Sequence, residues 1–186
     1  MRRLVAHSLP VALVVALTAC AAPEPSNFAA VQREDVYHFD SLAQMAATAD
    51  VVVEGLVTSV EKGRTIEVAH GAGLQFVLVS LGVKQVFAGK VDGTIVLEEE
   101  ATRGFEAGQH GVFFLHLKQD DPAAGYYRLV NSQSEFLFVD GVVTPSSDED
   151  IWIQKLESLD AASFEDLVRV AVEDDVAPAT PVLGST

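Results

Sequence analysis

The sequence predicts a mostly β fold, a small closed or nearly closed barrel with one short helix before it and one after it. Short runs rich in β-branched and aromatic residues recur through the middle of the chain, separated by Gly, Asp and Pro, which is typical of a barrel or sandwich. Apolar residues at helical spacing flank this region on both sides. A hydrophobic share of 49% in 186 residues is enough for the core of one domain.

The strand predictions follow from alternation and from turn residues. The run 51–60 is rich in valine, and Gly55 within it predicts a bulge or a sharp bend. The run 74–87 is the longest, and Gly82 near its middle would let the strand bend around a barrel corner. Asp140-Gly141 predicts a two-residue hairpin turn. The remaining predicted strands are 94–98, 112–117, 126–130 and 134–139.

Capping residues mark both helices. Ser41 with Gln44 three residues later forms a capping box, and the apolar stripe that follows consists of Leu42, Met45, Ala46 and Ala49. Ser163 is the predicted cap of the last helix, whose apolar stripe consists of Phe164, Leu167, Val168 and Ala171. We therefore expect each helix to bury one face.

The first twenty residues have the organisation of a secretory leader. A basic start at residues 1–3 precedes an apolar run over 4–16, which is shorter than the ~20 residues of a membrane-spanning helix. The run ends in Leu17, Thr18, Ala19 and Cys20, which resembles the lipobox of bacterial lipoproteins. The resemblance implies signal-peptidase recognition of Leu17, Thr18 and Ala19, cleavage before Cys20, and a diacylglycerol on the Cys20 thiol. The alternatives are an ordinary signal peptide with an unrelated cysteine and an uncleaved membrane anchor.

Composition then predicts four segments. Residues 1–19 are the leader, 20–38 a flexible tether rich in Pro, Ala and polar residues, 39–172 the barrel with its flanking helices, and 173–186 a disordered tail. We expect the lipid to hold the protein at the cell membrane, on the extracytoplasmic face.

The order of motifs in the body resembles the netrin-like (TIMP-like) branch of the OB-fold. The matching segments are 50–55, 86–90, 94–97, 105–109 and 112–115. The resemblance implies an OB-like barrel. Its eukaryotic members use disulfides and an N-terminal cysteine that chelates a protease zinc, whereas the only cysteine here is Cys20 of the lipobox, which the resemblance to lipoproteins assigns to the lipid. Protease inhibition by that mechanism therefore does not carry over.

Charge excludes one class of partner. The chain carries 12 Lys+Arg against 27 Asp+Glu, a formal net charge of −15, and a nucleic-acid-binding surface requires an excess of Lys and Arg. The single cysteine also excludes a disulfide framework and a multi-cysteine metal site.

Catalytic and metal-binding patterns are sparse. His110 and His116 flank one predicted strand, and with an acidic residue of the run 98–100 they could bind zinc, although each is also explained as an ordinary strand or loop residue. The acidic clusters lack the spacing of a calcium loop, and we interpret them as solvated surface, with weak binding of calcium as the alternative. There is no G-x-S-x-G elbow and no Ser–His–Asp set, so no catalytic residue is predicted.

Aromatic residues concentrate in the second half of the chain. Phe113, Tyr127, Phe136 and Phe138 are predicted to fill the barrel. Phe114, Tyr126 and Trp152 have the opposite parity or lie outside strands, so they are a candidate exposed binding patch, with burial of Trp152 at the barrel end as the alternative.

Together these patterns favour an envelope-anchored lipoprotein that binds an unidentified ligand, which could be an envelope protein. The alternative is a small metal-dependent or carboxylate-based envelope hydrolase. The two readings differ in what the barrel should show: an exposed binding surface in the first case, converging polar side chains in the second.

Overall fold

The structure is a computed structural model that describes residues 37–67, 73–120, 122–146 and 150–181. Its strands are β1 (Val51–Ile66), β2 (Leu74–Ala88), β3 (Thr94–Glu100), β4 (His110–Leu117), β5 (Tyr127–Leu129), β6 (Glu135–Val139) and β7 (Val142–Pro145). Its helices are α1 (Leu42–Thr48), α2 (Ile151–Gln154) and α3 (Ala161–Glu173), with short 3₁₀ turns η1 (Ala101–Arg103) and η2 (Pro122–Ala124).

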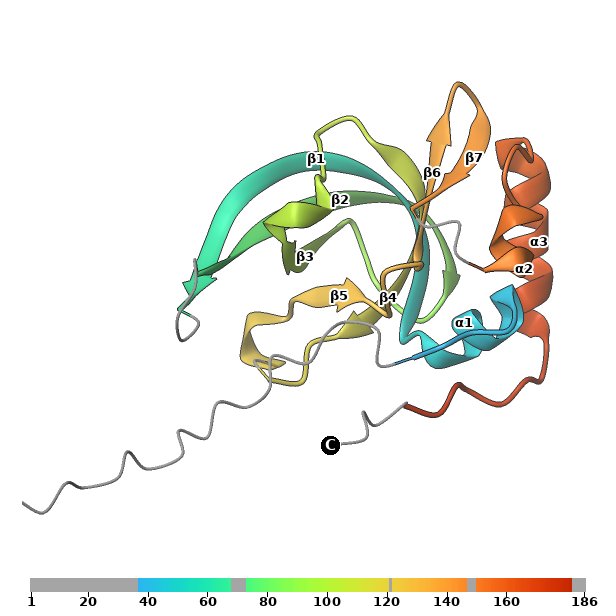
Figure 1. The fold of residues 1–186 in the computed structure, drawn as a ribbon, viewed down its shortest axis with the longest axis horizontal. Coiled ribbons are helices and arrows are strands. Elements are labelled where there is room, and N and C mark those ends of the chain that lie inside the picture. Colours follow the sequence, from blue (N-terminus) through green and yellow to red (C-terminus); the bar gives the residue numbers. More distant parts are fainter. Residues whose placement is uncertain (1–36, 68–72, 121, 147–149, 182–186) are drawn as a thin grey trace, which may run out of the picture. The chain divides into compact units, whose positions relative to one another are not determined.

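Five strands close into a barrel in the order β1-β2-β3-β5-β4-β1. Every pairing is antiparallel except that of β3 with β5. β6 and β7 extend the sheet from β4, and the three α-helices gather on one side of the barrel (Figure 1). The predicted mostly β, OB-like barrel with helices at both ends is confirmed.

β1 closes the barrel because it is long and strongly bent. Its first half pairs with β4 from Val51 to Leu56, while β2 accompanies it along nearly its whole length. The register with β2 shifts between Glu54 and Gly55, as predicted from the glycine inside a valine-rich run. The strand therefore leaves β4 and continues with β2 toward the β1–β2 hairpin.

The β6–β7 hairpin turns where the Asp-Gly pair predicts it. Asp140 and Gly141 have φ angles of 51° and 81°, the left-handed region that such a two-residue turn requires. Val139 and Val142 pair across the turn. The outer edge of β7 is covered, because Val143 exchanges backbone hydrogen bonds with Ser158 and Leu159.

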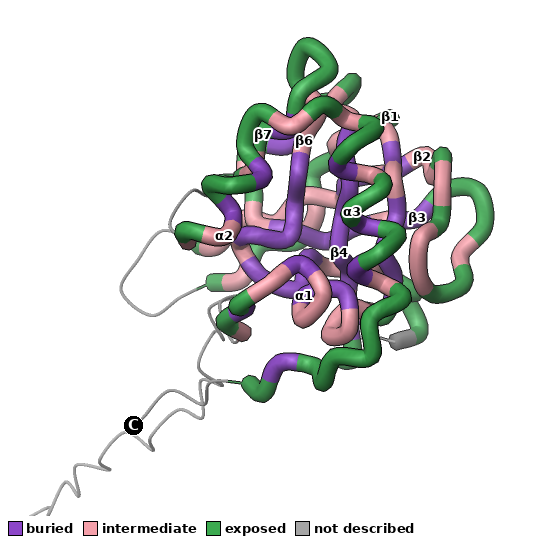
Figure 2. Tube along the Cα trace, turned by 90° about the vertical axis from the view of Figure 1, so that its right-hand side faces the viewer, coloured by how far each residue is buried: buried purple, intermediate pink, exposed green. Residues whose placement is uncertain are grey.

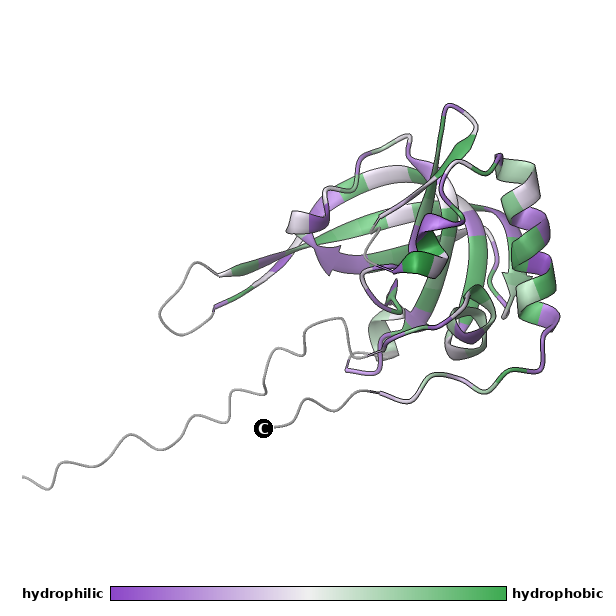
Figure 3. Ribbon diagram, turned by 45° about the vertical axis from the view of Figure 1, so that its right-hand side comes forward, coloured by the Kyte–Doolittle hydropathy of each residue, from purple (hydrophilic) through white to green (hydrophobic). Residues whose placement is uncertain are grey.

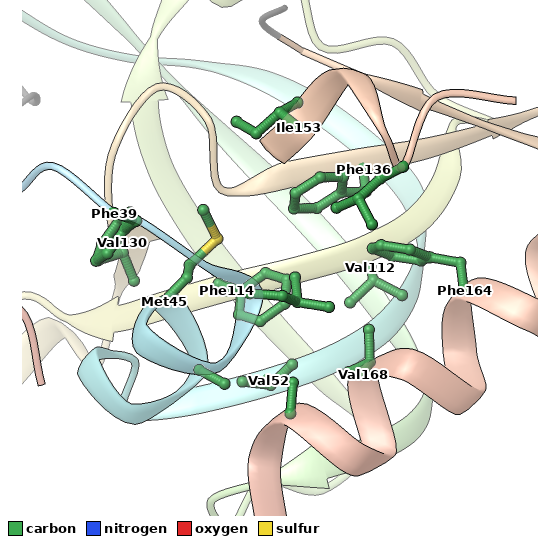
Figure 4. Packing of buried hydrophobic residues seen from close by; sticks show 14 of the residues in the cluster. Phe39, Met45, Val52, Val112, Phe114, Val130, Phe136, Ile153, Phe164 and Val168 are labelled. Atoms are coloured by element: carbon green, nitrogen blue, oxygen red, sulfur yellow. The ribbon is translucent and has the colours of Figure 1, made fainter. Parts of the chain in front are cut away.

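The described residues form two hydrophobic cores, one inside the barrel and one between the barrel and the helices. Phe113 belongs to the core inside the barrel. Phe114, the next residue in the chain, belongs to the core between the barrel and the helices. Figure 2 shows buried segments along β4, β6 and one side of α3. In Figure 4 the side chains of the second core extend from β1, β4 and β6 toward α1 and α3.

This second core corrects part of the aromatic assignment. Phe136 and Phe138 were predicted to fill the barrel, but Phe136 is a member of the second core and Phe138 packs against it. They alternate with residues that face the barrel, and α3 covers them through Phe164, whose ring centroid lies 4.9 Å from that of Phe136. The prediction that both rings lie inside the barrel is wrong, because the helices bury the outer face of β6 as well.

One helix cap is confirmed and the other is corrected. The Gln44 backbone N–H donates to Ser41 Oγ at 3.2 Å at the start of α1. In α3 the cap is Asp160, not Ser163, because the Ser163 N–H donates to the Asp160 carboxylate at 2.9 Å. Figure 3 shows hydrophobic and hydrophilic residues alternating along α3, as expected for a helix with one buried face.

The C-terminal segment also differs from its prediction. α3 ends at Glu173, one residue inside the predicted tail. The chain then returns to α1, where Ala179 is buried and its N–H donates to Thr48 Oγ1 at 2.8 Å. The described part of the tail is thus attached to the body of the domain.

Candidate functional site: charged groups at the barrel mouth

Four charged side chains meet near the end of the β1–β2 hairpin. Arg64 comes from β1, Glu98 from β3, Lys118 directly follows β4, and Asp120 lies in the β4–β5 connection. We call these four residues the rim cluster. Arg64 Nη2 lies 3.0 Å from Glu98 Oε2 and 3.4 Å from Asp120 Oδ2. Lys118 Nζ lies 3.4 Å from Asp120 Oδ2 and also contacts Glu98 Oε2.

The rim cluster has a buried half and an exposed half. The side chains of Glu98 and Lys118 are 6% and 5% exposed, whereas those of Arg64 and Asp120 are 46% and 57% exposed. Slight burial acts to raise the pKa of Asp120, but the cations Lys118 and Arg64 outweigh it and the pKa is lowered. Glu98 and Lys118 are buried, so the Arg64 guanidinium and the Asp120 carboxylate are the groups of the rim cluster that a partner can reach.

A second charged group lies deeper. Ile95 and Leu97 belong to the core inside the barrel, and by strand alternation Glu99 shares their face. The Glu99 side chain is fully buried, lies 3.3 Å from Arg103 Nε and accepts a hydrogen bond from the Leu129 N–H at 2.5 Å. Glu135 of β6 is opposite Phe113, which faces the barrel interior. We call Glu99, Arg103 and Glu135 the inner trio.

The inner trio contains a titratable group near neutrality. Burial raises the pKa of Glu135 to about 7, and the nearby Arg103 guanidinium opposes that rise. A carboxyl group with such a pKa has the property that a general acid needs. Glu135 is only 6% exposed, however, so this conformation does not present it to a substrate.

The two histidines of the considered zinc site do not converge. His110 and His116 are six residues apart on β4, about 20 Å along an extended strand. His110 Nε2 lies 2.6 Å from Glu54 Oε1 and 3.0 Å from Lys84 Nζ, and His116 Nδ1 lies 3.2 Å from Asp50. Within the described ranges no three His, Cys, Asp or Glu side chains are arranged to hold a metal ion. A zinc site that joins the two histidines is therefore wrong.

The candidate aromatic patch is not formed. Phe114 is 0% exposed, and its ring centroid lies 5.8 Å from that of Phe136 in an edge-to-face contact. Trp152 is partly buried against the second core, and its indole N–H donates to the Phe39 carbonyl at 2.7 Å. Tyr126 is half-buried directly before β5. The exposed-patch prediction is wrong for Phe114 because helices cover the outer face of the barrel there.

The remaining predicted site residues, Leu17, Thr18, Ala19 and Cys20, lie outside the described residues. In the described part of the chain, no helix combines the length and the hydropathy required to traverse a bilayer.

Sequence reasoning missed Arg64, Arg103, Lys118 and Glu135. It also interpreted the run 98–100 as solvated surface, whereas Glu98 and Glu99 are buried. One signal was available: the run continues the alternation of a predicted strand, so one of its glutamates had to share the face of Ile95 and Leu97. A buried carboxylate on that face requires a cation or several hydrogen-bond donors. Arg and Lys residues in the flanking segments were therefore candidate partners.

Fold and site define a class: a small OB-like β-barrel with a covering layer of helices and a charged mouth. No family model, no curated protein and no solved structure matches the chain.

Proposed function

We propose that this protein is an extracytoplasmic lipoprotein whose barrel binds an envelope protein through the exposed half of the rim cluster. The position of that cluster is the observation that carries the proposal. It joins the β1–β2 hairpin to the β4–β5 connection, and these two regions, with strands 2 and 3, form the ligand-binding face of OB barrels.

The chemistry of the exposed half suits a protein partner. Arg64 offers a planar guanidinium, and Asp120, only 3.4 Å away, offers a carboxylate, so a partner must present both charges in matching positions. Arg64 also lies over the Phe76 ring, at 5.3 Å from its centroid, which limits its freedom before binding. Preorganised charges of this kind favour specificity and fast association.

Anchoring is the second part of the proposal, and the leader supports it. A diacylglycerol on Cys20 supplies two acyl chains, which suffice for stable membrane attachment. The charge of −15 disfavours adhesion of the body to anionic lipid, so the barrel would stand off the membrane on the segment before Tyr37.

Membrane fractionation tests the anchor. The Cys20→Ser variant of the full chain should move from the membrane pellet to the soluble fraction, while the unmodified chain stays in the pellet. Equal sedimentation of both chains would exclude the lipid anchor.

Crosslinking capture from envelope membranes tests the rim. Asp120→Asn and Arg64→Ala should each lose a crosslinked protein that the unmodified chain retains, because each removes one exposed charge. Lys155→Ala, at an exposed lysine between α2 and α3, is the matched control and should retain it. Thermal unfolding of each variant shows that the fold persists. Capture of the same proteins by all four chains would contradict binding through the rim.

A further inference from the structure

β1 contains a bulge beside the rim cluster. The register between β1 and β2 shifts between Lys62 and Thr65, so that Gly63 and Arg64 together lie opposite the single residue Phe76. Gly63 suits this close approach, because a Cβ atom at this position would lie 3.1 Å from the Phe76 carbonyl oxygen. The bulge is in the part of the β1–β2 hairpin that extends away from the α-helices (Figure 1).

The bulge decides which face of the sheet carries Arg64. Val79 belongs to the core inside the barrel and Val77 packs against it, so Phe76 is on the outer face of β2. Lys62 pairs with Val77, so uninterrupted alternation would place Arg64 on the inner face as well. The Arg64 guanidinium instead lies over the Phe76 ring, 5.3 Å from its centroid. The extra residue has therefore moved this side chain to the outer face.

The outer face is where Arg64 meets the carboxylates of the rim cluster. Ile95 and Leu97 belong to the core inside the barrel, so Glu98 is on the outer face of β3. Arg64 Nη2 lies 3.0 Å from Glu98 Oε2 and 3.4 Å from Asp120 Oδ2. If Arg64 were on the inner face, the sheet would separate its guanidinium from Glu98. The rim cluster thus depends on the bulge.

The side chain of Gln75 holds the bulge through its amide. Gln75 Nε2 shares its two hydrogens among the carbonyl oxygens of Gly63 at 3.2 Å, Arg64 at 3.0 Å and Phe76 at 2.7 Å. The Thr65 hydroxyl donates to Gln75 Oε1 at 2.9 Å and so orients the amide. One amide therefore fixes the backbone of both residues in the contact between the guanidinium and the ring.

We propose that Gln75 is a positioning residue of the rim cluster: its amide stabilises the bulge of β1 and thereby places the Arg64 guanidinium beside the two carboxylates of the cluster. The use of the rim in binding is the proposed function, on which this role of Gln75 rests, whereas the placement of Arg64 is measurable without a partner. Because the guanidinium is placed before a partner arrives, loss of the amide should weaken binding although no charge is removed.

NMR spectroscopy of the full chain tests the placement through Asp120. Slight burial raises the pKa of Asp120, and Lys118 and Arg64 lower it. Gln75→Met keeps the length of the side chain but removes the amide, so Arg64 should move away from Asp120. The pKa of Asp120 should then rise toward its ordinary value of 3.8, in the same direction as in Arg64→Ala.

The Arg64 side chain provides a second signal. Its guanidinium lies over the Phe76 ring, so the ring current should shift its side-chain protons upfield, and this shift should shrink in Gln75→Met. Crosslinking capture of the rim partner should also fall, but less than in Arg64→Ala, because the charge remains. Gln85→Met, at a half-buried glutamine of β2 outside the bulge, is the matched control and should leave all three signals unchanged.

A second variant keeps the test decisive if Gln75→Met folds poorly. Thr65→Val removes the hydroxyl that orients the amide, and it should change the Asp120 pKa and the Arg64 shift in the same direction by less. Unchanged values of both in Gln75→Met, or equal changes in Gln85→Met, overturn the role of Gln75. Failure of the proposed function is distinguishable: Arg64→Ala would then retain the captured protein while Gln75→Met still raises the Asp120 pKa.

Discussion

Replacing Phe114 by alanine tests whether the outer face of the barrel is a true core. Phe114 is 0% exposed and lies between the barrel and α1, in contact with the ring of Phe136. Removal of a buried phenylalanine side chain costs about 3–5 kcal/mol of unfolding free energy. About 0.5–1.5 kcal/mol of this belongs to the edge-to-face pair with Phe136. If Phe114 lay on a solvated face of the barrel, its replacement by alanine would change the unfolding free energy by no more than about 0.5 kcal/mol.

Urea unfolding measures the difference. The signal can be followed by fluorescence of Trp152, the only tryptophan, and by circular dichroism, which does not depend on the environment of Trp152. Leu167→Ala is the control, because Leu167 is on α3 but 42% exposed. The double variant Phe114→Ala/Phe136→Ala should show a coupling energy of about 0.5–1.5 kcal/mol. A loss below about 1 kcal/mol for Phe114→Ala would refute the two-core architecture.

Three further predictions concern charge and capping. Burial raises the pKa of Glu135 from 4.5 to about 7, so the protonated group stabilises the folded state fully below pH 4.5, and this contribution is lost as pH rises through 7. The free energy of unfolding should therefore fall by up to about 3 kcal/mol over this range. Urea midpoints measured across pH 4.5–8 should show the fall, and Glu135→Gln should remove it. Lys118→Met leaves the buried Glu98 with only Arg64, so the unfolding free energy should fall by about 3–5 kcal/mol, whereas an unchanged urea midpoint would show that the pair is dispensable. Ser41→Ala removes the hydrogen-bond acceptor at the start of α1 and should lower the free energy of unfolding by about 1 kcal/mol, measured by thermal melting. Ser41→Asp should retain most of the stability, because its carboxylate can also accept from the Gln44 N–H.

Local chemistry made several elements predictable. The left-handed φ angles of Asp140 and Gly141 are a property of that dipeptide, and the cap of α1 needs only Ser41 and the residues that follow it. The last helix shows where local reasoning fails. Asp160 and Ser163 are both acceptable caps, and Asp160 is selected because the helix starts where Val142 of β7 pairs with that residue.

The candidate site was largely unpredictable for a related reason. Arg64 and Asp120 are 56 residues apart in the chain, and their contact exists only because β1 bends around the barrel toward the β4–β5 connection. Likewise, Arg103 follows β3 closely, but the Ser132 carbonyl that accepts its hydrogen bond reaches it only after the chain has formed β4 and β5. Sequence spacing carries no information about such contacts unless the strand order is already known.

The sequence by itself determined most of the strands and the sharp turns, because these depend on side-chain alternation and backbone preference. The order of its motifs, which resembles that of netrin-like OB domains, predicted the OB-like barrel. Only the tertiary structure decided which side of each strand is buried. Phe113 and Phe114 are adjacent residues that both reach 0% exposure, one inside the barrel and one beneath the helices. Alternation separates two faces of a strand, but burial of either face depends on what the rest of the chain packs against it.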